Sequence, residues 1–229
     1  MDQQLILLPT TQLLEKFGAG NHVPGSGSAA AFSGILACKL SLTVIKLTKE
    51  KEDYAAVEPR MNFIETQIVN MLEPALFEAF QKDSDEFDKV IAVRLQRKQE
   101  TDLKKRKQLG DQARELLRPA TEVPVQICEV CHSVCQHALS LFDLGFQSAR
   151  GDSGTAATLA LAGANGALFT CYLNLKEFRS GDWAKETRRR CDELLQRSTD
   201  LQISLFSRVA RLQEEGIEPT AIQLELKMD

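Results

Sequence analysis

Two long stretches built from small residues constrain the fold more than any other feature of this sequence. Residues 28–48 and 152–175 are rich in Ala, Gly, Ser and Thr and carry few large side chains. Small side chains let helix backbones approach closely. A helix with so little polar surface must also be covered on all sides. We therefore expect both stretches to be helices at the centre of a bundle or at an interface between subunits.

Helical spacing of apolar residues also dominates the rest of the chain, and we find no convincing strand alternation. Further helices are predicted over residues 11–17, 57–95, 125–142 and 182–212, with a charged, exposed helix start before Pro119. We expect a kink at Pro74, interruptions at Pro119 and Pro124, and a break at Gly181. The structure preference is weak after about residue 212. We predict one all-α domain over residues 1–229, a bundle of long helices around the two small-residue helices. A dimer would cover those helices more easily than a monomer, so we expect a homodimer.

Composition narrows the class of protein. The chain is 43% hydrophobic and 26% charged, as in ordinary soluble globular proteins. A net charge of -4 does not favour nucleic-acid binding. Lys39 and Lys46 interrupt the first small-residue stretch, which is typical of a buried helix rather than a membrane span. The start of the chain lacks signal-peptide features, so we expect a cytoplasmic protein with no nucleic-acid or membrane partner.

A glycine-rich loop, "GAGNHVPGSGS", precedes the first small-residue helix, and Ser28 is a candidate N-cap. Free N–H groups at a helix start favour an anion, so the loop is a candidate ligand site. It matches neither a Walker A loop nor the dinucleotide fingerprint, and a structural turn would use glycine too. His22 is the only histidine near this candidate site, and it could equally be an ordinary loop residue.

Two aspartates are candidates for acid–base chemistry. Asp83 lies on the apolar stripe of its helix, where lost hydration would raise its pKa. Pairing with a Lys or Arg of a neighbouring helix is an equally good interpretation. Asp152 precedes a run of helix formers, which is typical of an N-cap, and a cap can also face a ligand. Arg150 beside it could hold a carboxylate or orient an aspartate.

The run "CEVCHSVCQH" resembles a haem-attachment or metal motif, but its cysteines recur at three and four residues, on one helix face. Buried, reduced thiols explain that spacing, and a zinc site would need further ligands elsewhere. His132 and His137 fall off this stripe, and we expect them at the surface. We predict no metal and no cofactor.

Four stretches in order resemble the cyclodeaminase/cyclohydrolase family, the domain found at the C-terminal end of formiminotransferase-cyclodeaminase and as free-standing bacterial proteins. They cover roughly residues 10–210. The first, "VPGSGSAAAFSGILACKL", resembles the family's Pro-Gly-Gly-Gly-Ser loop and helix. The others match at Lys51 and Tyr54 in "LTKEKEDY", at Asp83, Phe87 and Val90 in "KDSDEFDKVIA", and at Asp152, Gly154, Gly166, Ala167 and Asn174 in the segment from Gly151 to Leu175.

Several positions depart from the family pattern. The sequence has Ser26, Glu50, Glu86 and Gly151 where the family has Gly, Gly, Ala and Ser, and Phe146 and Thr170 where members often have Asn. The resemblance implies an all-helical homodimer that acts on a one-carbon tetrahydrofolate adduct. The reaction would be cyclisation of 5-formimino-tetrahydrofolate with loss of ammonia, or hydrolysis of 5,10-methenyl-tetrahydrofolate. The departures leave open a non-enzymatic, ligand- or partner-binding relative, and an unrelated helical bundle would lack the pocket altogether.

For the enzyme, we expect Asp83 and Asp152 to be the catalytic acid and base. The resemblance implies that the substrate is bound by a further set of residues: Pro24, Gly25, Ser26, Gly27, Ser28, Lys51, Tyr54, Phe87, Gly154 and Asn174.

Overall fold

The computed structural model describes residues 4–215, and every regular element within that range is helical. The long helices are α1 (Thr10–Gly18), α2 (Ser26–Lys49), α3 (Glu58–Gln67), α4 (Glu73–Gln99), α5 (Leu103–Leu144), α6 (Arg150–Leu175) and α7 (Asp182–Glu215). Short 3-10 turns are η1 (Leu5–Leu7), η2 (Glu52–Val57) and η4 (Gln147–Ala149), and η3 (Ile68–Leu72) is a π-helical turn. The predicted all-α class is confirmed.

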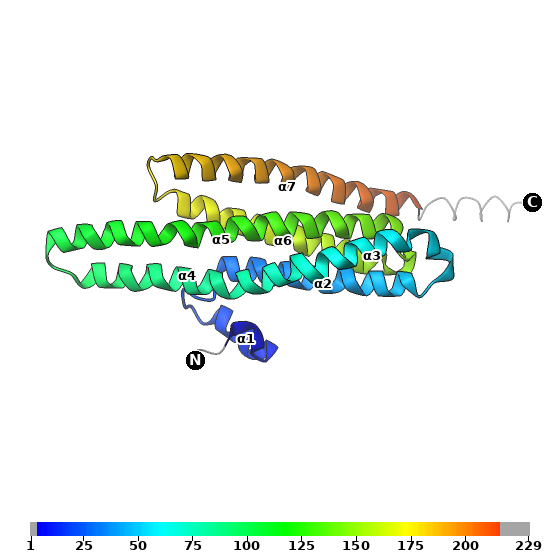
Figure 1. The fold of residues 1–229 in the computed structure, drawn as a ribbon, viewed down its shortest axis with the longest axis horizontal. Helices are drawn as coiled ribbons and strands as arrows, with labels where there is room; N and C mark the ends of the chain where they lie inside the picture. Colours follow the sequence, from blue (N-terminus) through cyan, green and yellow to red (C-terminus); the bar gives the residue numbers. More distant parts are fainter. Residues whose placement is uncertain (1–3, 216–229) are drawn as a thin grey trace, which may run out of the picture.

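The helices form an elongated bundle in which α4 and α5 run side by side as an antiparallel hairpin (Figure 1). Helix α6 packs against α5 and α2, and α2 also packs against α4. Helix α7 lies along one edge of the bundle, while α1 projects from the opposite edge. The two small-residue stretches, now α2 and α6, pack against each other along their length, as their composition predicts.

Glycines permit the close approach of α2, α5 and α6. A Cβ atom on Gly163 would lie 2.7 Å from the backbone oxygen of Ala30 and 3.0 Å from Sγ of Cys131. A Cβ atom on Gly34 would lie 2.8 Å from the same sulfur. No backbone atom can move aside without shifting its helix, so Gly163 fixes the separation of α2 and α6.

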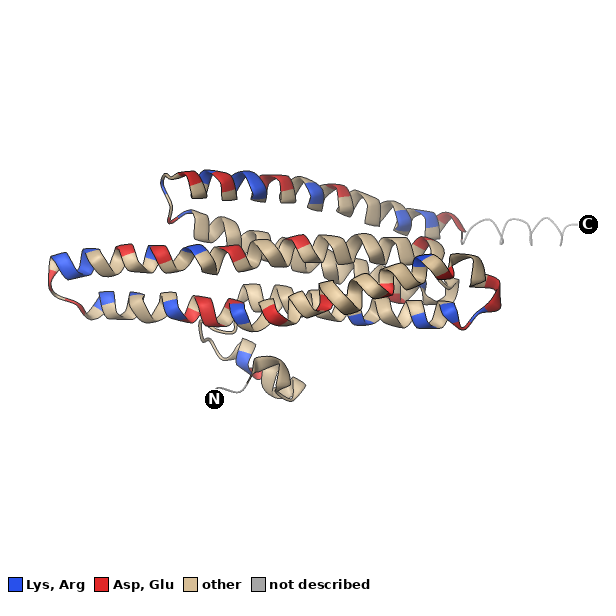
Figure 2. Cartoon of the chain, viewed as in Figure 1, with Lys and Arg blue, Asp and Glu red and all other residues tan. Residues whose placement is uncertain are grey.

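The bundle does not cover α6 on every side. Its outward residues include Thr155, Thr158, Ala162, Phe169 and Leu173, all exposed. Charged residues gather along α7 and where α4 meets α5 (Figure 2), whereas the sequence of α6 carries none after Asp152. By length and composition α2 and residues 147–175 could each cross a membrane, but 56% and 50% of their most apolar windows are buried inside the bundle.

Two prolines that the sequence analysis places at interruptions lie inside a continuous helix. Pro119 and Pro124 lie inside α5, which continues without a break from Leu103 to Leu144. Because Pro124 has no N–H, the Ala120 carbonyl loses its helical partner, and Asn174 of α6 donates to it instead at 3.4 Å. A tertiary hydrogen bond thus replaces the one that proline removes. Just before Pro74 the chain forms the π-helical turn η3, and Pro74 itself lies in the first turn of α4. A kink at Pro74 stays a prediction.

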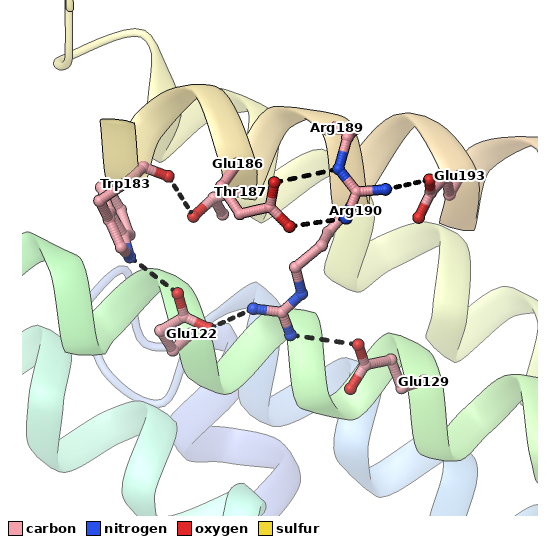
Figure 3. A network of polar contacts seen from close by, with 8 residues as sticks. All are labelled: Glu122, Glu129, Trp183, Glu186, Thr187, Arg189, Arg190 and Glu193. Atoms are coloured by element: carbon pink, nitrogen blue, oxygen red, sulfur yellow. Dashed lines mark hydrogen bonds and ion pairs between the residues drawn. The ribbon is translucent and has the colours of Figure 1, made fainter. Parts of the chain in front are cut away.

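Figure 3 shows how α7 is held to α5. Arg190 donates to Glu122 at 3.0 Å and to Glu129 at 3.1 Å, and the Trp183 indole donates to Glu122 at 2.9 Å. The predicted break at Gly181, whose φ is +117°, is confirmed. Helix α7 extends past Leu212 to Glu215, and the rest of the tail lies outside the described residues.

His132 is fully buried, contrary to the prediction that it lies at the surface. Its Nε2 lies 2.8 Å from Oγ of Ser198 on α7, so α7 covers a helix face that an isolated α5 would leave open. Burial, reinforced by the charge of Arg197, lowers the pKa of His132 to about 4. His137 is half-buried.

All six cysteines are free and buried, which confirms the prediction for the three on the α5 stripe, Cys128, Cys131 and Cys135. Burial raises the pKa of the Cys128 thiol to about 12 and that of Cys135 to about 11. Within residues 4–215 no group of three His, Cys, Asp or Glu side chains is arranged to hold a metal ion. The use of no cofactor stays a prediction.

Replacing Gly163 by alanine should separate α2 from α6. We expect Gly163→Ala to lower the free energy of unfolding by about 1–3 kcal/mol, the usual cost of overpacking a core. Gly151→Ala, on the same helix, places its Cβ in open space and should not destabilise the protein. Urea unfolding of both variants tests this, and equal stabilities would contradict it.

Candidate functional site

A pocket of about 230 Å³ opens where the glycine-rich loop meets α4 and α6. The loop and the first turn of α2 form one wall, and the last turns of α6 form another. Its lining residues are His22, Val23, Gly25, Ser26, Gly27, Asp83, Phe87, Ala120, Thr170, Leu173 and Asn174. The structure thus brings together five of the residues proposed from the sequence for substrate binding, and one of the two proposed catalytic aspartates.

Among residues 4–215, Asp83 is the only carboxylate in this lining, and the residue is 7% exposed. Its Oδ2 accepts hydrogen bonds from the Ser28 backbone N–H at 2.8 Å and from the Ser28 hydroxyl at 3.0 Å. Among the described residues no ion pair involves Asp83. The alternative of a partner Lys or Arg therefore finds no support there.

The bond to Ser28 corrects the predicted cap of α2. Helix α2 begins at Ser26, its N-cap is Gly25, and neither Gly25 nor Ser28 supplies a capping side chain. Asp83, from α4, instead accepts from an N–H in the first turn of α2. The anion expected at this helix start is therefore the protein's own carboxylate.

Gly27 is required for that arrangement. A Cβ atom on Gly27 would lie 2.0 Å from Oδ1 of Asp83, a distance that no side chain could tolerate. The glycine lets α2 approach the carboxylate closely enough for its N–H to donate. The sequence "GSGS" therefore includes a glycine whose role is close approach to α4.

Burial raises the pKa of the Asp83 carboxyl above its usual range, and the hydrogen bonds from Ser28 oppose that rise. A carboxyl group in such surroundings can hold a proton at a pH where an exposed aspartate would not. It is therefore suited to general acid–base catalysis near neutral pH.

Asp152, the second proposed catalytic residue, lies at the opposite end of the bundle. Asp152 is half-buried in the first turn of α6, and Ala149, not Asp152, is the N-cap. Asp152 and Thr170 are about 27 Å apart along α6 at 1.5 Å per residue. One chain therefore cannot place Asp152 beside Asp83, and the expected catalytic pair does not form within it.

Lys51 and Tyr54 organise the turn that leads into α6. The Tyr54 hydroxyl accepts from the Gln147 N–H at 3.2 Å, and its ring packs edge-on against Phe146. Nζ of Lys51 lies 5.1 Å from the centre of the Phe146 ring. Thr48 accepts from the Phe146 N–H at 2.9 Å. These residues lie at the Asp152 end of α6.

Three other proposed residues are also outside the lining of the Asp83 pocket. Gly154 lines a separate hollow of about 370 Å³ between α6 and α7. Pro24 is buried, and Ser28 reaches the site through its bonds to Asp83. The peptide bond between Val23 and Pro24 is cis.

The sequence profile of the family described as formiminotransferase-cyclodeaminase matches residues 9–193. The chain belongs to this family. A relative from Methylorubrum extorquens named methenyltetrahydrofolate cyclohydrolase is 28% identical over 196 residues, which are 86% of this chain and 93% of the relative. The resemblance drawn from the four sequence stretches is thereby confirmed.

The fold also matches a family structure. The crystal structure of formiminotetrahydrofolate cyclodeaminase from Thermotoga maritima has a TM-score of 0.77 to this chain at 20% identity, and the match covers 91% of this chain and 98% of the other. At that identity the likeness shows that the two chains share one fold.

Sequence reasoning missed Val23, Ala120 and Leu173 in this site of a formiminotransferase-cyclodeaminase family member, and it named Thr170 only as a departure from the family pattern. Thr170 and Leu173 precede Asn174 by four and one residues. Helical spacing places Thr170 on the same face as Asn174, so that neighbour could have been proposed from the sequence. Ala120 carries no such signal, because it lines the pocket only through its packing beside α6.

Asp83→Asn should change how stability depends on pH. In the wild-type protein the folded state holds the Asp83 proton more tightly than the unfolded state. Its free energy of unfolding therefore falls as pH rises from the unfolded pKa to the folded pKa. The variant lacks this fall, so its stability relative to wild type should increase across that range and then level off.

Urea unfolding between pH 4 and pH 8 measures this difference. Asp88→Asn, an exposed site on the same helix, is the matched control and should follow the wild-type curve. A constant offset between Asp83→Asn and wild type at every pH would contradict the expectation.

Proposed function

We propose that the protein is a folate one-carbon enzyme that hydrolyses 5,10-methenyl-tetrahydrofolate. The observation that carries the proposal is a buried carboxyl with a raised pKa in a pocket built by the family's motif residues. The name of the Methylorubrum relative, which aligns over most of both chains, favours hydrolysis. Cyclisation of 5-formimino-tetrahydrofolate with loss of ammonia is the other reaction of this family to be assayed.

Asp83 can serve both proton transfers of the hydrolysis. A water molecule attacks the methenyl carbon and gives its proton to the Asp83 carboxylate. The same proton then passes to the ring nitrogen as its bond to that carbon breaks. The remaining proton of the added hydroxyl leaves to solvent, and a formyl group is left on the other nitrogen. Each step requires the carboxyl to gain or lose a proton near neutral pH, and the buried position of Asp83 favours this.

The size of the pocket indicates which part of the substrate it holds. Its volume of about 230 Å³ is below the roughly 300–1,000 Å³ that is typical of pockets for whole ligands. We propose that it receives the fused ring system with the one-carbon bridge, and that the rest of the folate extends outside. We further propose that the enzyme acts in the cytoplasm without a cofactor and without nucleic-acid or membrane partners.

A second copy of the chain is the proposed occupant of the uncharged outer face of α6. That face is apolar or neutral from Thr155 to Leu173, and α6 is long enough to pair antiparallel with its own copy. In such a dimer, Asp152 of the partner subunit would approach the Asp83 pocket. Asp152 lies about 27 Å along α6 from the pocket of its own chain. The dimer would instead bring it to the pocket of the other chain.

Turnover is measured by the loss of methenyl absorbance, and ammonia release measures formimino cyclisation. We expect wild type and Asp88→Asn to hydrolyse the methenyl adduct. Asp83→Asn should lose about 10²–10⁴-fold in kcat, the usual contribution of a general acid–base group. Folate binding without turnover of either adduct would contradict the enzyme and support the non-enzymatic alternative.

Mixing two inactive variants tests the shared site. If each site needs Asp83 from one chain and Asp152 from the other, Asp83→Asn and Asp152→Asn should each be inactive alone. After the two are refolded together, roughly half of the dimers are mixed and one of their two sites is intact, so about a quarter of wild-type activity should return. A monomer in sedimentation experiments, or no recovery from mixed dimers, would contradict the shared site.

A further inference from the structure

Two departures from the family pattern touch each other at the rim of the Asp83 pocket. Oγ of Ser26, the first residue of α2, lies 2.7 Å from Oγ1 of Thr170 on α6. These are the positions where family members have glycine and often have asparagine. Both residues line the pocket, and 144 positions of sequence separate them.

Thr170 also contacts the backbone of its own helix. Oγ1 of Thr170 lies 3.2 Å from the backbone oxygen of Gly166, to which it can donate. A hydroxyl has one hydrogen, so both contacts are hydrogen bonds at once only when Ser26 donates to Thr170. In that arrangement the donors run from Ser26 to Thr170 to Gly166, and each hydroxyl hydrogen is used.

The Ser26 oxygen is left with its lone pairs. With its hydrogen given to Thr170, this exposed oxygen at the pocket can accept a hydrogen bond but not donate one. Asp83, which lines the pocket from α4, is also an acceptor when it is ionised. In that state the two residues present acceptors to a ligand, which match a ligand edge carrying N–H groups.

We propose that Ser26 binds an N–H donor of a reduced pterin ring and that Thr170 is the positioning residue that fixes Ser26 as an acceptor. This inference rests on the proposed function, because it takes the ligand to be a tetrahydrofolate. The N–H groups of the ring are common to both candidate substrates. The pair therefore contributes to affinity for either adduct and does not choose between them.

The experiment measures Kd, kcat and KM for methenyl- and formimino-tetrahydrofolate in Ser26→Ala, Thr170→Val and the double variant. Each single change should raise Kd about three- to tenfold for both adducts, as expected for the loss of one hydrogen bond, with kcat changed less than about twofold. The double variant should bind no more weakly than Ser26→Ala, because Thr170 acts through Ser26. Thr170→Ser, which keeps the hydroxyl, should bind both adducts with the Kd of wild type.

Thr66→Val is the matched control, because Thr66 makes the same bond to the carbonyl four residues earlier, on α3 away from the pocket. Three results would each overturn the proposal. They are a Kd increase in the double variant equal to the product of the two single increases, an unchanged Kd in Thr170→Val, and an effect confined to the formimino adduct. If wild type binds folate without turnover, the proposed enzyme fails while the Kd values still test the pair. If wild type binds neither adduct, both proposals fail.

Discussion

The hydrogen bond from the Ser28 N–H to the Asp83 carboxylate is the contact on which the site depends. It joins the start of α2 to the middle of α4 and fixes the glycine-rich loop over the pocket. The carboxylate is buried, so it loses water, and the two bonds from Ser28 return only part of that stabilisation. The fold holds an ionisable group where its charge is costly, which is the condition for proton transfer near neutral pH.

The scaffold around Asp83 uses two further constraints of the backbone. Gly27 leaves room for the carboxylate, and Gly163 leaves room for α2 to lie against α6. Pro124 leaves the Ala120 carbonyl without a helical donor, and the side chain of Asn174 on α6 donates to that carbonyl instead. Residues without a catalytic role thus determine the positions of the pocket walls, because each controls how closely two helices can approach or which backbone group needs a partner.

The helices and the burial of Asp83 could be predicted from the sequence because both are local patterns of spacing. The prediction that Pro119 and Pro124 interrupt α5 is wrong. For Pro124, the compensating bond to the Ala120 carbonyl comes from Asn174, a residue far along the chain. The burial of His132 depends on α7 covering it, which no periodicity within α5 indicates. Asp83 and Asp152 match one family pattern, but sequence order carries no information on distance. The rigid length of α6 is what separates Asp152 from the pocket.

The departures from the family pattern differ in what their side chains contact. Ser26 and Thr170 contact each other at the pocket rim, and Thr170 also contacts the Gly166 backbone oxygen. Phe146 packs against Tyr54 and lies under Lys51, two residues that do match the family pattern. The first pair lines the Asp83 pocket, whereas Phe146 lies at the Asp152 end of α6, outside that lining. The changed positions therefore fall into two groups with separate consequences, because the first can act on a ligand in the Asp83 pocket and the second acts on the turn that leads into α6.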